Sequence, residues 1–171
     1  MLDEDQPPHR NGNTEEGKTM NEFPLKPPRR GFHEGSWTVQ ELHFQAIFRE
    51  IQFCYFPGWK NGFMWRVRVN RHLPWFVDGY CRPNFFSIEI NPNAVRIYSE
   101  FGIKLIFFHE AAHAVTTQRH GGQWFHRMKG IAARLKQEGE TYMAQLLMLE
   151  ADGHARRAEY EERGTPPPFQ I

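Results

Sequence analysis

The sequence predicts an α+β domain in which a short three-stranded sheet packs with a leading helix, a central helix and two further helices. Apolar residues recur at helical spacing over 37–54 and in three later stretches. Alternating apolar and polar residues over 63–70 are typical of a half-buried strand. Aromatic residues make up 15% of the 171-residue chain, which is enough bulky surface for one core and excludes a wholly disordered chain.

The leading helix is expected over 37–54, with Ser36 as its N-cap and Pro57-Gly58 as its end. Its expected apolar face comprises Leu42, Ala46, Ile47, Ile51 and Cys54. Three strands are expected over 63–70, 75–81 and 85–90. In the first of them Trp65, Val67 and Val69 should face the core, with the intervening arginines facing solvent.

The later helices are expected over 100–117, 123–138 and 141–162, after a short apolar segment at 94–98. The folded domain should therefore span 35–163. Residues 1–34 are rich in proline and charge and predict a disordered N-terminal tail. Residues 164–171 predict a second, Pro-rich tail.

Composition excludes several classes of protein. No apolar run approaches the roughly 18 residues of a membrane span. A formal net charge of +1 gives no overall attraction to nucleic acid. Cys54 and Cys81 are too few for a disulfide scaffold or a four-cysteine zinc ribbon. The acidic start lacks the apolar region of a signal peptide, so a cytoplasmic location is expected.

The decisive motif is H-E-x-x-H at residues 109–113, in the middle of a predicted helix. The i, i+4 spacing puts the imidazoles of His109 and His113 on one helix face, where both can bind one Zn²⁺ ion. Glu110 beside them can take a proton from a water that the metal has acidified. The motif therefore predicts a zinc site with Glu110 as catalytic base.

A zinc enzyme needs a third protein ligand, and His120 is the leading candidate. In a continuous helix His120 would lie about 10.5 Å beyond His113, so the helix must end between Thr116 and Arg119. The two glycines Gly121-Gly122 that follow favour a break in the chain's helical structure. His120 would then be the first residue of the next helix, with its side chain directed back to the metal. Two alternatives stay open: Glu150, either as ligand or as acceptor for a ligand histidine, and His126.

These residues resemble the SprT-like zinc metallopeptidases, in which HExxH is followed by a His-Gly-x-x-aromatic segment. Here that segment is His120-Gly121-x-x-Trp124. Gly79-Tyr80-Cys81 is similar to the family's Gly-x-Cys/Ala segment, and Ile88–Pro92 to its strand ending in Asn-Pro. The resemblance covers roughly residues 37–138.

The resemblance implies a small zincin-like domain with His109, His113 and His120 as zinc ligands and Glu110 as catalytic base. It also implies hydrolysis of peptide bonds by a zinc metalloendopeptidase that acts on proteins bound or crosslinked to DNA. The alternative is a nucleic-acid or partner-binding module with a structural or inactive zinc site.

Two surfaces are candidates for partners. The strand at 85–90 runs towards the active-site helix and is expected to be an exposed edge that binds an extended substrate. Segment 60–82 has five basic residues against one acid, with aromatics between them, and is a candidate contact for single-stranded nucleic acid. Its basic residues are Lys60, Arg66, Arg68, Arg71 and Arg82.

Overall fold

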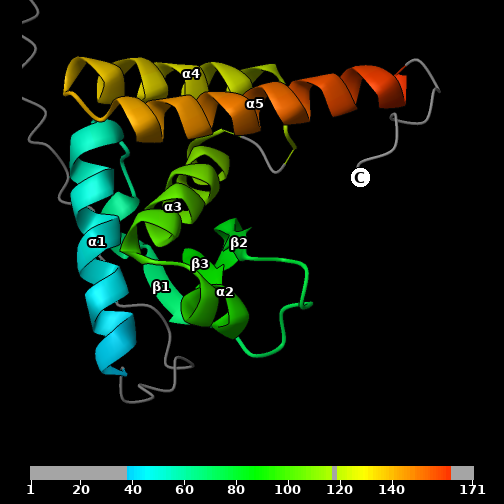
Figure 1. Cartoon of the computed structure of the whole chain (residues 1–171). Coiled ribbons are helices and arrows are strands. Elements are labelled where there is room, and N and C mark those ends of the chain that lie inside the picture. The colour runs from blue at the N-terminus through cyan, green and yellow to red at the C-terminus, as the bar shows by residue number, and fades with distance from the viewer. Residues whose placement is uncertain (1–37, 117–118, 163–171) are drawn as a thin grey trace, which may run out of the picture. The chain divides into compact units, whose positions relative to one another are not determined.

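The computed structural model of the chain describes residues 38–116 and 119–162 (Figure 1). The chain divides into two units, Met1–Gly35 and Ser36–Ile171, and the first lies wholly outside the described residues. The tails expected at 1–34 and 164–171 also lie outside the described residues, so their disorder stays a prediction.

The described part is a mixed α+β fold with five helices and a three-stranded sheet, which confirms the expected fold class at this level. The helices are α1 (Val39–Tyr55), α2 (Pro92–Ile97), α3 (Glu100–Val115), α4 (Gly122–Gln137) and α5 (Thr141–Glu162). The strands are β1 (Arg66–Val69), β2 (Gly79–Arg82) and β3 (Ser87–Ile90). Short 3₁₀ turns at Gly62–Met64 and Pro83–Phe85 replace the first residues of two expected strands, and α2 was expected only as an apolar segment.

Helix α1 begins two residues later than expected, because Thr38 rather than Ser36 is its N-cap. The Thr38 hydroxyl accepts a hydrogen bond from the Glu41 amide at 3.1 Å. The Glu41 carboxylate accepts one from the Thr38 amide, also at 3.1 Å. This reciprocal pair is a capping box, and it requires a Glu or Gln three residues after the cap. The residue three positions after Ser36 is Val39, whose side chain cannot accept a hydrogen bond from a backbone amide.

The buried face of α1 is only partly the expected one. Ile47 and Ile51 are buried as expected, but Leu42 is 54% exposed and Ala46 is exposed. Phe44 and Phe48 are buried instead, with ring centroids 6.3 and 5.7 Å from that of Phe107 on α3. Two aromatic rings bury more apolar surface than Leu42 and Ala46 would, so the helix turns this face to the core.

Strand β3 is the centre of the sheet, whose order is β1-β3-β2. It pairs in parallel with β1 and antiparallel with β2, and all four of its residues are buried. The expectation of an exposed edge at 85–90 is therefore wrong, because both sides of this strand are already hydrogen-bonded. The edge strands are β1 and β2. In β1 the alternation is as expected, with Val67 buried between two exposed arginines.

Asn91 joins the end of β3 to the start of α2 and is 2% exposed. Its side-chain amide donates hydrogen bonds to the carbonyl oxygens of Pro74 at 2.8 Å and Val77 at 2.9 Å. Its side-chain oxygen accepts the Asn93 amide at 2.9 Å and so caps α2. One side chain thus ties the loop before β2 to the helix after β3.

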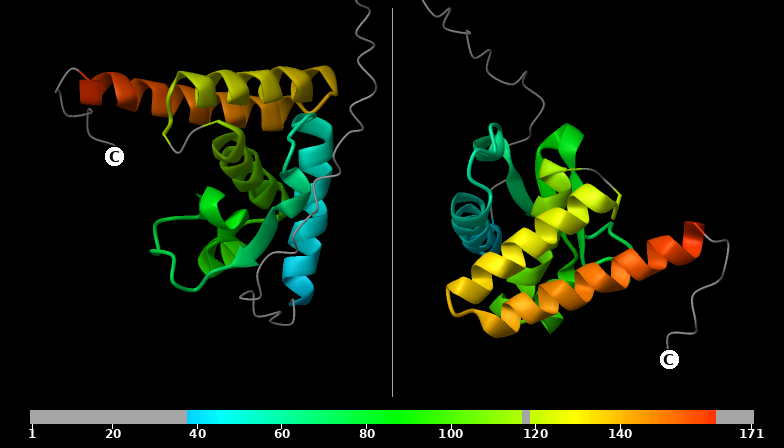
Figure 2. Two further views of the ribbon diagram at one scale, coloured as in Figure 1. Left: turned by 180° about the vertical axis from the view of Figure 1, so that it is seen from behind. Right: turned by 90° about the horizontal axis from the view of Figure 1, so that it is seen from above.

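Helix α3 lies between the sheet and the α4–α5 hairpin, so the H-E-x-x-H motif is inside the fold (Figures 1 and 2). Its buried apolar residues are Ile103, Phe107, Phe108, Ala111 and Ala112. Helices α4 and α5 are joined by a turn in which Gly139 has φ of +90°, a conformation that favours glycine. Among the described residues, no helix combines the length and apolarity that a membrane crossing requires.

Replacing Asn91 should destabilise the fold strongly. Asn91→Ala removes both side-chain donors and the α2 cap, and we expect the free energy of unfolding to fall by about 2–4 kcal/mol. Urea denaturation followed by tryptophan fluorescence measures this loss. Asn93→Ala is the control, because only the backbone of that exposed residue enters the cap. Equal stability of the two variants would contradict the role assigned to the Asn91 side chain.

Candidate metal centre

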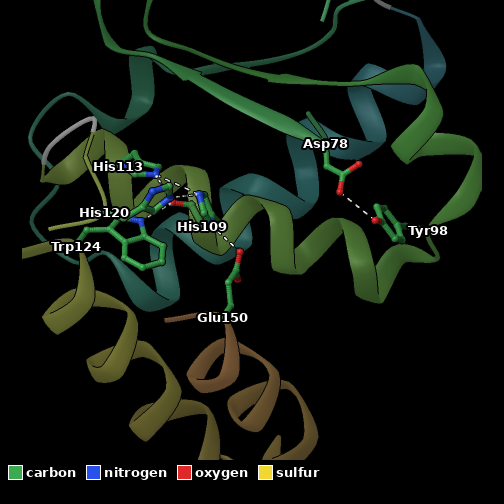
Figure 3. A network of polar contacts seen from close by, with 7 residues as sticks. All are labelled: Asp78, Tyr98, His109, His113, His120, Trp124 and Glu150. Atoms are coloured by element: carbon green, nitrogen blue, oxygen red, sulfur yellow. Dashed lines mark hydrogen bonds and ion pairs between the residues drawn. The ribbon is translucent and has the colours of Figure 1, made fainter. Parts of the chain in front are cut away.

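Three histidine side chains converge at the end of α3 (Figure 3). The Nε2 atom of His113 lies 3.1 Å from that of His109 and 3.1 Å from that of His120. The third side of the triangle, between His109 and His120, measures 3.0 Å. The structure therefore brings together all three histidines that the sequence indicated as ligands.

The triangle, with sides of 3.0–3.1 Å, is slightly smaller than that of a tetrahedral zinc site. Three imidazole nitrogens bound to one Zn²⁺ ion lie about 3.4 Å apart, with their ring centroids about 5 Å apart. Here the three pairs of ring centroids are 4.9, 4.9 and 4.6 Å apart. Imidazole is also a ligand that zinc prefers, so both geometry and donor type fit this ion.

The chain reaches this arrangement because α3 ends at Val115. Thr116 terminates the helix, and its hydroxyl donates a hydrogen bond to the Ala112 carbonyl at 2.6 Å. His120 follows in the connection and lies two residues before the start of α4, so it precedes that helix rather than opening it. The break after His113 is what allows His120 to return to the histidines of α3.

Trp124, in the first turn of α4, forms one wall of the cluster and is fully buried. Its indole nitrogen donates to the His109 carbonyl at 3.4 Å. Its ring centroid lies 5.0 Å from that of His109, 5.5 Å from His113 and 4.6 Å from His120. The aromatic side chain of the His-Gly-x-x-Trp segment therefore packs directly against the candidate metal ligands.

Glu150 and His126 were the open alternatives for the third position. The Glu150 carboxylate lies 2.7 Å from Nδ1 of His109, the ring nitrogen outside the triangle (Figure 3). This is the position of an acceptor for a ligand histidine, one of the two roles left open. His126 is exposed on α4 and lines a separate hollow with residues of α1 and α4, such as Tyr55 and Arg127.

Sequence reasoning missed His154 on α5. Ligand atoms of His109, His120 and His154 all lie within 4.8 Å of one another, close enough to hold a metal ion. The two possible groups of three thus share His109 and His120. The His154 ring stacks on that of His120, with centroids 3.7 Å apart and planes 13° apart. Its position four residues after Glu150 was the available signal, because i, i+4 residues share a helix face.

Glu110 is 6% exposed and faces β2. A Cβ atom on Gly79 would lie 3.0 Å from the Glu110 Oε1 and 2.5 Å from a methyl carbon of Ile106, so only glycine permits this approach. The Cys81 backbone amide donates a hydrogen bond to the carboxylate. Burial raises the pKa of Glu110 to about 7, against the opposing effects of His109 and of this hydrogen bond.

His120 is held as a neutral base. Burial lowers its pKa to about 3, and the charges of His154, His109 and His113 act in the same direction. A neutral imidazole keeps a lone pair, which is the form that binds metal ions. The imidazole of His120 is therefore unprotonated at neutral pH and can bind a metal cation.

No protein-family model matches this chain, and no curated protein or solved structure matches it.

The buried Glu110 carboxyl should make the metal-free chain less stable as pH rises. Its folded-state pKa lies above the unfolded value, so its proton stabilises the fold below about pH 4.5, and this contribution is lost towards pH 7. Glu110→Gln stays neutral, so relative to wild type it should gain about 3 kcal/mol of stability between pH 4.5 and pH 8.

Urea unfolding in the presence of a chelator at several pH values measures this difference. Glu140→Gln, at an exposed position before α5, is the control for losing one negative charge. A difference between Glu110→Gln and wild type that does not change with pH would contradict the raised pKa.

Proposed function

We propose that this protein is a zinc-dependent metalloendopeptidase of SprT-like type, which hydrolyses peptide bonds in protein substrates, including proteins associated with DNA. The observation that carries the proposal is the triangle of His109, His113 and His120 Nε2 atoms, 3.0–3.1 Å on each side. The buried Glu110, adjacent to His109 in the same helix, supplies the base.

The donor set supports a catalytic rather than a structural zinc site. Structural zinc sites are usually closed by four protein ligands and are rich in cysteine. Three imidazoles with a carboxylate beside them are typical of catalytic sites, which keep one position open for water or substrate. A structural site would have no use for Glu110.

Zinc, when bound, polarises the scissile carbonyl group and acidifies the attacking water. The Glu110 carboxylate accepts the proton of that water and returns it to the nitrogen of the leaving group. Trp124 excludes water from one side of the histidines, and His120 contributes an unprotonated nitrogen.

The edge of β2 is the substrate-binding edge in this proposal, in place of the strand expected from sequence. β2 pairs only with β3 in the sheet, and the Cys81 amide on its other side reaches Glu110. An extended peptide added to this edge would bond to backbone groups other than the Cys81 amide, which already donates to Glu110, and would pass the Glu110 carboxylate. Tyr80, 45% exposed on the same strand, is available to contact substrate side chains.

Glu110 and His120 should have separable roles. Glu110→Gln should bind zinc like the wild type but lower kcat/KM on an unfolded protein such as casein by about 10²–10⁴-fold, because only the proton acceptor is lost. His120→Ala should lose zinc as well as activity. Elemental analysis and a protease assay on the same preparations measure both properties.

His126→Ala is the matched control for His120→Ala, since it removes an exposed histidine from α4. It should keep both zinc and activity. Undiminished cleavage by Glu110→Gln would show that Glu110 is not the base. A wild-type protein that binds zinc but cleaves no protein would favour the alternative, a binding module with an inactive zinc site.

Contact with single-stranded nucleic acid is a second candidate function, favoured by one observation. Trp75 and Phe76 in the loop before β2 are 79% and 70% exposed, with their rings in edge-to-face contact at 5.7 Å. Exposed aromatic rings near basic side chains can stack on unpaired bases. Trp65, by contrast, is buried and belongs to the core.

If these rings stack on bases, Trp75→Ala should weaken binding of a single-stranded oligonucleotide by about 1–3 kcal/mol, and binding should weaken with salt. Fluorescence anisotropy at several salt concentrations measures both effects. Phe53→Ala, which removes an 85% exposed ring from α1, is the control. Equal affinities for Trp75→Ala and wild type would exclude the loop as the contact.

A further inference from the structure

We infer that Glu150 and His154 of α5 are positioning residues for the metal centre: Glu150 orients His109, and His154 supports the ring of His120. This inference rests on the proposed zinc site and adds to it a role for α5. Neither residue belongs to the H-E-x-x-H or His-Gly-x-x-Trp segments.

The contact between Glu150 and His109 determines which nitrogen of His109 carries hydrogen. An ionised carboxylate only accepts hydrogen bonds, so at 2.7 Å the Nδ1 atom of His109 must be the donor. In a neutral imidazole the other nitrogen then has the lone pair. That nitrogen is Nε2, which points at Nε2 of His113 and His120. Glu150 therefore turns the free lone pair of His109 to the centre of the triangle.

His154 contacts His120 in a way that differs from a shared metal ion. Two imidazoles on one tetrahedral ion have centroids about 5 Å apart. The three pairs in the triangle meet this value, whereas His154 and His120 are nearly parallel at 3.7 Å. His154 is thus stacked on His120 as a support, although its ligand atoms come within 4.8 Å of those of His109 and His120.

His120 needs such support because it lies in a connection and not in a helix. Its ring has Trp124 on one side, with centroids 4.6 Å apart and planes at 87°, and the face of His154 stacked on it. Two aromatic contacts from two helices limit the rotation of a ring whose own backbone is not in regular structure.

Helix α5 can serve as a scaffold because one face of it is packed and buried. Residues 150 and 154 are one turn apart, so their side chains leave the helix in the same direction. The buried residues around them are Met143, Ala144, Leu147 and Ala151. Leu149, next to Glu150, points elsewhere and is 64% exposed.

The test is metal affinity, measured with Zn²⁺ by competition with a coloured chelator and with Co²⁺ by its visible spectrum. Glu150→Gln should weaken Zn²⁺ binding by about 10–100-fold, and Glu150→Asp should restore part of the loss, because a carboxylate returns near Nδ1. Leu149→Ala should match the wild type. Melting of the metal-free variants separates loss of metal affinity from loss of fold.

His154→Phe and His154→Ala separate support from ligation, because Phe keeps a flat ring and has no ligand atom. Support of His120 predicts that the Phe variant keeps wild-type affinity and Co²⁺ spectrum, while the Ala variant loses affinity. Equal loss in both variants would show that His154 is a ligand and would overturn its role as a support.

Unchanged affinity in Glu150→Gln would overturn the role of Glu150. These failures differ from failure of the proposed function, in which the wild type itself would bind no zinc or would bind zinc and cleave no protein.

Discussion

The meeting of His113 and His120 is the constraint on which the rest of the site depends. In one continuous helix, seven residues would separate them by about 10.5 Å, but their Nε2 atoms are 3.1 Å apart. Helix α3 therefore has to stop within a turn of His113, and it does so at Thr116, whose hydroxyl bonds back to Ala112. Helix α4 must then begin close to the cluster, which brings Trp124 of its first turn against the histidines.

Placing these groups together has an electrostatic cost in the metal-free chain. Burial lowers the pKa of His120 to about 3, and the neighbouring imidazoles act in the same direction. The buried Glu110 carboxyl responds in the opposite direction, with a pKa of about 7. A divalent cation bound between the histidines would lower the pKa of Glu110 and would disfavour protonation of His120 still further. Strongly shifted pKa values of this kind are common at functional sites.

The sheet and α5 approach α3 from different sides and serve different parts of the site. Central strand β3 is buried and hydrogen-bonded on both sides, so it supports the fold, while the edge strand β2 lies beside Glu110 and its Cys81 amide donates to that carboxylate. Gly79 permits this close approach because it has no Cβ. Helix α5, carried by its packing on α4, brings Glu150 and His154 to the two ligand candidates His109 and His120. The base and the histidines thus have separate supports.

Sequence patterns predicted four of the five described helices, the approximate positions of the strands and the local part of the site. The pairing of His109 with His113 follows from helix periodicity, and the return of His120 follows from rise per residue and from Gly121-Gly122. The buried face of α1, the central place of β3 and the approach of α5 follow from tertiary packing and not from local sequence patterns. Glu150 is 41 residues from His109, and no local rule relates them. Such contacts depend on which apolar faces bury the most surface against each other, and this is a property of the whole packed core.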